Sequence, residues 1–224
     1  MSARRERAEL TRQAILDGAA EAFDAAGFGS TSLSDIAKHS GVTKGAMYFH
    51  FPSKEALAHE LMSSQFDILT ILPEVERPGV QSAIDMTHLM AHGLRSRVRI
   101  RAGIRLVIEF GSFTDPDPAV YNSWIENVRD NLAPAQGRGD VKPEVNVADA
   151  ATYLVGAFAG VQITSQVRTQ REDLHERVTD MWTWLLPGLV PARRVAKFEP
   201  KGSADVWELI ERDEAGLRAA LPAD

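Results

Sequence analysis

The chain has 224 residues, a formal charge of −6 at pH 7 and no cysteine. The absence of cysteine excludes disulfides, thiolate metal sites and thiol nucleophiles and favours a reducing compartment, so we expect a cytoplasmic protein. The charged N-terminus lacks the apolar stretch of a secretory signal, and no run of eighteen apolar residues follows, so we expect no membrane span.

The first part of the chain predicts short helices with clear boundaries. Residues 9–26 place apolar side chains three and four apart, which predicts a helix with one buried face, and Gly27 ends it. Ser32 and Asp35 form a near capping box for a short second helix, and Gly41 closes it. The sequence therefore predicts two helices before the stretch GVTKGAMYFHF, which begins at Gly41.

A third helix begins directly after that turn. Thr43 can cap it, and Pro52 stops it just after Phe51. Ser53 then opens a fourth helix, which we expect to extend toward Leu72. The second and third helices, joined by a tight turn that contains glycine, have the spacing of a helix-turn-helix.

The middle of the chain continues as helices, with one ambiguous segment. After a turn at residues 73–79, apolar side chains from Val80 to Leu94 share one helical face. In residues 95–110, arginines alternate with apolar residues at the period of a strand. The sequence predicts no second strand that could pair with this segment, so we predict a helix. Such basic runs are usually solvated faces with internal ion pairs, so we do not place it on DNA.

Two apolar helices follow the longest predicted loop. The sequence FTDPDP breaks the chain, residues 119–133 are helical, and 134–144 form a polar loop that we expect to be mobile. Residues 147–170 are rich in alanine and apolar residues nearly all round the helix, and 174–186 carry many large apolar groups. This predicts a four-helix contact between two copies, with burial inside one core as the alternative. A basic link and a last helix, 204–221, end the chain.

The third helix separates an inner side from an outer side. Met47 and Phe51 share a face and point to the core, whereas Lys44, Gly45 and Tyr48 are left outside. A lysine at the first turn, beside minimal side chains, can enter a major groove and donate hydrogen bonds to guanine. The alternative is a solvated charge among ordinary surface aromatics.

The predicted DNA surface comprises this outer side and its flanks. Up to position 65 the chain has seven Lys and Arg against eight Asp and Glu, so the surface must be local. Hydroxyl, imidazole and ammonium groups at its edges suit phosphate oxygens. We predict DNA contacts by Thr43, Lys44, Gly45, Ala46, Tyr48, Phe49, His50 and Lys54. The arginines within residues 4–12 are either a solubilising tail or further phosphate contacts.

The stretch STSLSDIAKHSGVTKGAMYFHFPSKEAL closely resembles the DNA-binding domain of TetR-family repressors. The phrase GVTKGAMYFHFPSKEALA, the segment YNSWIENV and the ending MWTWLLPGLVPARRVAKF are similar to the γ-butyrolactone receptors of actinomycetes. The resemblance implies an all-α protein with a three-helix helix-turn-helix domain, 1–52, and a larger helical domain for ligand binding and dimerisation, 53–224. It also implies a homodimeric repressor that binds a palindromic double-stranded DNA operator and is released by a small butyrolactone-like effector.

Trp124 is the best single candidate for effector binding, because it lies in the segment that resembles the receptors' own pocket tryptophan. The alternative is a plain core tryptophan. Polar groups in the apolar helix 147–170 need partners, which an effector or water could supply. The predicted effector-binding residues are Trp124, Gln65, Gln162, Thr164, Ser165, Phe110 and Met90. We expect effector binding to swing the fourth helix, change the separation of the two Lys44 helices and release DNA.

Two other functions compete with this prediction. His88 and His92 are spaced as in helical metal sites, but Leu89 replaces the glutamate of an HExxH peptidase, so we prefer surface histidines and predict no enzyme, metal site or cofactor. A sensor of drugs or fatty acyl compounds would keep the same fold. A cationic drug needs buried carboxylates, and Glu109 and Glu126 are the nearby candidates.

Overall fold

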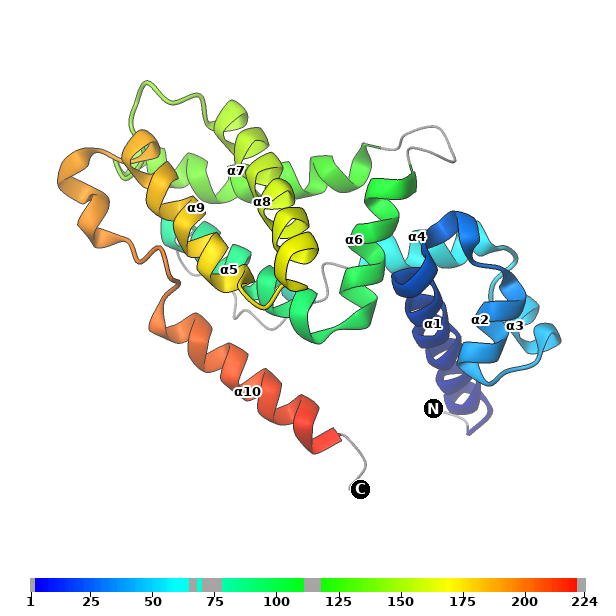
Figure 1. Ribbon diagram of the computed structural model, residues 1–224. Helices are drawn as coiled ribbons and strands as arrows, with labels where there is room; N and C mark the ends of the chain where they lie inside the picture. The colour runs from blue at the N-terminus through cyan, green and yellow to red at the C-terminus, as the bar shows by residue number, and fades with distance from the viewer. Residues whose placement is uncertain (1–2, 65–67, 70–77, 111–117, 221–224) are drawn as a thin grey trace. The chain divides into compact units, whose positions relative to one another are not determined.

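The computed structural model describes residues 3–64, 68–69, 78–110 and 118–220, and every regular element in them is helical, which confirms the all-α prediction (Figure 1). The helices are α1 Ala3–Ser30, α2 Leu33–Ser40, α3 Lys44–His50, α4 Lys54–Ser64, α5 Val80–Ser96, α6 Val98–Phe110, α7 Ala119–Gly137, α8 Val147–Thr169, α9 Leu174–Leu189, the 3-10 helix η2 Ala192–Lys197 and α10 Ala204–Ala220.

The chain packs as two compact units. The first comprises Met1–Asp67 with Arg97–Val120, and the second comprises Ile68–Ser96 with Tyr121–Asp224. The first unit therefore contains α4 and α6 in addition to the three helices of the predicted helix-turn-helix domain. The division of function into 1–52 and 53–224 stays a prediction.

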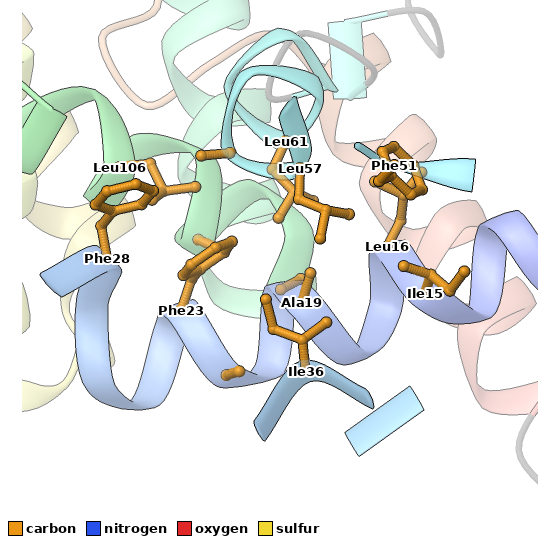
Figure 2. Close-up of a cluster of buried hydrophobic side chains, with 14 of the residues drawn as sticks. Ile15, Leu16, Ala19, Phe23, Phe28, Ile36, Phe51, Leu57, Leu61 and Leu106 are labelled. Carbon is orange, nitrogen blue, oxygen red and sulfur yellow. The ribbon is translucent and has the colours of Figure 1, made fainter. Parts of the chain in front are cut away.

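The core of the first unit is built around α1, which contacts α2, α4 and α6 (Figure 2). Phe23 is fully buried, and its ring stacks on Phe28 at a centroid distance of 5.9 Å. Gly18 lets α2 approach, because a Cβ at this position would lie 2.7 Å from Ser40 Cα. Other buried core side chains are Ile15, Leu16, Ala19, Ile36, Met47, Phe51, Leu57, Leu61 and Leu106.

The segment with strand-like arginine spacing is the helix α6, as predicted. Its buried residue Ile100 lies between Arg99 and Arg101, which reach aspartates about two turns apart along α1. Arg99 Nε donates to Asp17 at 2.6 Å, and Arg101 Nε donates to Asp24 at 2.9 Å. These two arginines therefore form internal ion pairs on either side of the buried Ile100.

Helix α1 changes conformation where the sequence predicted its end. Gly27 has φ 76°, and the following N–H, of Phe28, donates to the Glu109 carboxylate at 2.8 Å. Arg105 Nε donates to the same carboxylate at 2.6 Å. A Cβ at position 27 would lie 2.6 Å from Glu109, so glycine is required both for its φ and for this close approach.

In the second unit, α5 is enclosed by other helices rather than lying at the surface. Residues 88–94 of α5 are all buried. Trp182 of α9 donates its indole N–H to Thr87 Oγ1 at 2.8 Å. Helix α10 packs on α5, and the Asp85 carboxylate accepts hydrogen bonds from the N–H and hydroxyl of Ser203, both at 2.8 Å.

The preferred interpretation of His88 and His92 as surface histidines is wrong. Both are buried, because α10 and the link before it cover this part of α5. His88 Nε2 lies 2.9 Å from Pro200 O, whereas His92 Nε2 lies 2.9 Å from Asp213 Oδ2. The two imidazoles have different partners, so they do not converge on one metal position.

The prediction of a mobile loop at 134–144 is also wrong, in two respects. Helix α7 continues through Pro134 to its end at Gly137. Beyond it, Val141 is fully buried and Asp140 is 5% exposed. Arg194 and Lys197 contact the Asp140 carboxylate at 2.5 and 3.0 Å. Burial raises the pKa of Asp140, but these hydrogen bonds outweigh it and hold the pKa below its ordinary value.

Helix α8 is apolar yet largely exposed within the chain. By length and composition alone it could cross a membrane, because an 18-residue window has a mean hydropathy of 1.2, and only 22% of that window is buried. The chain's own core therefore covers only a small part of α8. Large exposed apolar residues of α8 and α9 are Tyr153, Ile163, Val167 and Trp184.

Candidate nucleic-acid interface

Two caps and a glycine set the geometry of the helix-turn-helix. Ser32 Oγ accepts from Asp35 N at 3.2 Å and Asp35 accepts from Ser32 N at 2.9 Å, which is the predicted capping box. Hydrogen bonds from the Ser32 hydroxyl and backbone lower the pKa of Asp35. Gly41 has φ 65°, and Thr43 Oγ1 accepts from Ala46 N at 3.2 Å to start α3.

Helix α3 has the predicted inner and outer sides. Met47 is fully buried and Phe51 is 4% exposed. Lys44 and Gly45 are exposed, and Ala46 is half-buried. A Cβ at Gly45 would meet no atom within 4 Å, so the space in front of this glycine is open. Another surface can therefore approach the backbone of α3 at this point.

Aromatic groups occupy the rest of the outer side of α3. Tyr48 is 54% exposed and Phe49 is 81% exposed. The Phe49 ring meets the half-buried His50 ring edge to face, with the ring centroids 5.1 Å apart. Helix α3 thus places the predicted contacts within 44–50 on one short element, directly after the cap Thr43.

Lys54 stands apart from this surface. Its Nζ donates to Phe28 O at 2.8 Å and to Thr31 O at 3.0 Å, and it lies 4.1 Å from the centroid of the Phe28 ring. Two of its three N–H donors are thus used inside the chain. The sequence predicted a charge available to DNA, whereas the structure shows this charge holding the start of α4 to the end of α1.

The N-terminal arginines have two different environments. Arg12 donates to Glu60 at 2.7 Å, and its guanidinium lies 5.0 Å from the centroid of the Phe51 ring, so it braces α1 against α4. The three earlier arginines are exposed on the first turns of α1. Only these three have side chains free to follow a phosphate backbone.

The predicted effector-binding residues in the described part of the chain differ in burial and in their hydrogen-bond partners. Met90 is fully buried and Trp124 is half-buried. Gln162 accepts from Arg171 at 3.0 Å, Ser165 donates to Asp173 at 2.6 Å, and the exposed Thr164 donates to its own helix backbone at 2.8 Å. Gln65 and the side chain of Phe110 lie outside the described residues.

The partners of Gln162 and Ser165 were missed by the sequence analysis. Gln170 and Arg171 both have positive φ, 54° and 69°, and this turn brings Asp173 back to the end of α8. Hydrogen bonds from Ser165 and then Thr169 lower the pKa of Asp173. The contact joins side chains across the turn and Asp173 makes no side-chain cap bond to α9, so no local capping pattern predicts it.

Comparison with known proteins assigns both parts of the chain. Residues 15–61 match the bacterial regulatory proteins of the tetR family, and residues 75–191 match the C-terminal domain of tetracycline repressor-like proteins. The A-factor receptor protein of Streptomyces griseus is 36% identical over 225 residues, which cover 99% of this chain and 80% of that protein.

Solved structures agree with this assignment. TylP, a TetR regulator from Streptomyces fradiae, is 37% identical with a TM-score of 0.79, covering 92% of this chain and 98% of that one. An ArpA-like gamma-butyrolactone receptor is 32% identical with a TM-score of 0.73, covering 92% and 99%. CprB from Streptomyces coelicolor, solved with its biological operator sequence, is 32% identical with a TM-score of 0.68, covering 94% and 99%. The chain therefore belongs to the TetR family of DNA-binding regulators, as its sequence predicted, and is not an enzyme.

Proposed function

We propose that two copies of this chain bind a palindromic duplex operator through their α3 helices and repress transcription until a small γ-butyrolactone-like effector releases them. The observation that carries the proposal is the outer side of α3. It combines an exposed lysine, a glycine with open space in front of it and exposed aromatics on a helix that is rigidly capped. A similar protein, CprB, has been solved with its operator.

The chemistry of α3 suits a major groove. Lys44 can donate to O6 and N7 of guanine, and Gly45 allows the backbone to come close to the base edges. Tyr48, His50 and the hydroxyl hydrogen of Thr43 suit phosphate oxygens at the rim of the groove. Among the described residues no acidic side chain pairs with the exposed Lys44, so its charge is available to DNA.

A second copy best accounts for the exposed apolar surface of α8 and α9. Trp184 is 84% exposed, Val167 80% and Tyr153 65%. A monomeric soluble protein rarely exposes such large apolar side chains together, so they indicate an interaction surface. Gly156 and Gly160 of α8 have open space in front of them, so a partner helix can approach closely. A symmetric contact between two copies would bury this surface, and it accounts for the apolar α8 in a cytoplasmic protein without a membrane.

The effector is proposed from the relatives together with the chain's own residues. The related proteins include an A-factor receptor and a gamma-butyrolactone receptor. Trp124 offers a flat apolar face and one N–H for a lactone carbonyl, and Met90 is apolar. An effector that binds one arrangement of the two units better than the other shifts their balance, moves α4 and takes the two α3 helices away from the roughly 34 Å spacing of one DNA turn.

A cationic drug is a poorer fit than a lactone. Such a ligand needs a buried carboxylate without a partner. Glu109 is bound by Arg105 and by the Phe28 N–H, and Glu126 is exposed. Neither of the two predicted carboxylates is therefore free to receive a buried cation.

The test is a binding assay on the DNA that flanks the chain's own gene, carried out at several salt concentrations. We expect affinity to fall steeply with salt, because phosphate contacts release counterions. A synthetic γ-butyrolactone should then release the DNA from the unmodified protein but not from Trp124→Ala. Normal release from Trp124→Ala would remove this residue from the proposed site, and absence of DNA binding at low salt would contradict the proposal as a whole.

A further inference from the structure

Phe49 is the most exposed large apolar side chain described in the first compact unit. It is 81% exposed, compared with 68% for Leu10 and 45% for Ile108. On α3 it lies about 200° around the helix from the fully buried Met47, so it points almost directly away from the core. Exposure of a phenylalanine to water at this position is unfavourable, and covering the ring with another surface would lower the free energy.

The surroundings of Phe49 define what can cover it. A side chain on a helix leans over the preceding turn, and here that turn carries Gly45, whose outer side is open. The ring also contacts the His50 ring, which is nearly perpendicular to it, with centroids 5.1 Å apart. One small apolar group of a bound partner can therefore pack against the Phe49 ring on its open side, next to Gly45.

The chemistry of the major groove identifies that group. Base edges there present hydrogen-bond donors and acceptors, which a phenyl ring cannot satisfy, and the one apolar group among them is the C5-methyl of thymine. We propose that Phe49 reads a thymine methyl in each half of the operator. This proposal rests on the proposed function, and it adds a specificity-determining contact to the hydrogen bonds of Lys44.

The experiment starts from a random-sequence duplex library, from which the full-length protein selects a defined duplex. Each thymine of that duplex is then replaced singly by uracil, which removes only the methyl. We expect one position in each half-site where the replacement weakens binding about fourfold, the effect of one buried methyl. The duplex bound by Phe49→Ala should be insensitive at that position, and Phe49→Leu, which keeps an apolar side chain, should retain part of the effect.

Ile108→Ala is the matched control, because Ile108 is an exposed apolar residue of the same unit on α6. This variant should show the same dependence on uracil as the unmodified protein. If the library yields no enriched duplex, the proposed function itself fails. If a duplex is enriched but every uracil replacement is neutral, or if Phe49→Ala stays as sensitive as the unmodified protein, DNA binding stands and the methyl contact is overturned.

Discussion

At the scale of single residues, glycines with different surroundings show how the same residue type serves the fold and the surface. Gly18 stands where α1 and α2 touch, and an added Cβ would collide with the backbone of Ser40. Gly45 stands on the outer side of α3, where an added Cβ would meet nothing. Sequence spacing alone placed Gly45 outside, but only the packed helices show that a side chain at Gly18 would collide with α2.

This contrast gives a prediction for Gly45→Ala. Alanine has the higher helix propensity, so we expect the free energy of unfolding to stay the same or rise by up to about 1 kcal/mol. Duplex binding should weaken at least about tenfold, because the Cβ occupies the space that the base edges need. Urea unfolding and a gel-shift titration measure the two effects. Gly18→Ala is the opposite control: it should cost about 1–3 kcal/mol of stability.

A second residue-scale prediction concerns acid. Burial lowers the pKa of His175 from 6.5 to about 3, and burial also lowers the pKa of His88, whose Nδ1 lies 3.3 Å from Nδ1 of His175. The unfolded chain therefore binds protons that the folded chain rejects. Stability should be full above pH 6.5 and should fall as the pH drops from 6.5 toward 3.

Urea unfolding at pH 7.5 and pH 5 checks this. We expect a loss of about 1–2 kcal/mol at pH 5. In His175→Gln the loss between the two pH values should be clearly smaller, since the main group that resists protonation is gone. An unchanged pH dependence in this variant would show that other groups cause the acid sensitivity.

At the scale of elements, α10 is held on α5 by polar contacts as well as by its apolar face. Val206 and Ile210 are buried, and the Asp85 carboxylate receives both the N–H and the hydroxyl of Ser203 just before α10 begins. His92 contacts Asp213 near the middle of the helix. The matched family domain ends at residue 191, before α10 begins, whereas the similarity to the A-factor receptor protein covers 99% of this chain.

We therefore predict that Asp85→Ala loosens α10. Loss of the carboxylate leaves the Ser203 N–H without its partner, which should cost about 1–3 kcal/mol. Limited proteolysis should cleave the link before α10 sooner than in the unmodified protein. Glu208→Ala, which changes an exposed position on the same helix, is the control and should leave the cleavage rate unchanged. Equal rates for both variants would contradict the role of Asp85.

At the scale of the whole molecule, DNA reading and self-association are proposed to depend on each other. In the proposed function one α3 helix would contact only half of a palindrome, and a second copy would add its half at high effective concentration. The apolar surface of α8 and α9 is the feature that would join the copies. TetR-family membership is shown by the relatives, whereas this dependence is a property to be measured.

Trp184→Glu tests the dependence directly. A carboxylate buried between two copies is strongly unfavourable, so we expect dimers to become monomers at micromolar concentration. Duplex affinity should fall by about 100-fold or more. Analytical ultracentrifugation and a DNA titration measure both. Ala215→Glu, on the exposed side of α10, introduces the same charge elsewhere and should change neither property. A Trp184→Glu protein that remains dimeric would exclude this face as the interface.

Much of the DNA-binding unit follows from the sequence because its signals are local. The Ser32–Asp35 capping box, the left-handed Gly41 and the Thr43 cap each involve residues within a few positions, and the spacing of Met47 and Phe51 fixes the inner side of α3. The family resemblance rests on the same short stretch, and the comparisons confirm it.

The tertiary structure decided which polar groups are already occupied. Lys54 binds carbonyls some 25 positions earlier, a separation that no local pattern encodes. His88 and His92 are covered by a helix more than 100 residues away, and the loop after α7 is fixed by Asp140 and its distant cations. Helix periodicity and caps are set by neighbours along the chain, whereas the burial and pairing of a charge depend on which distant segments pack against it.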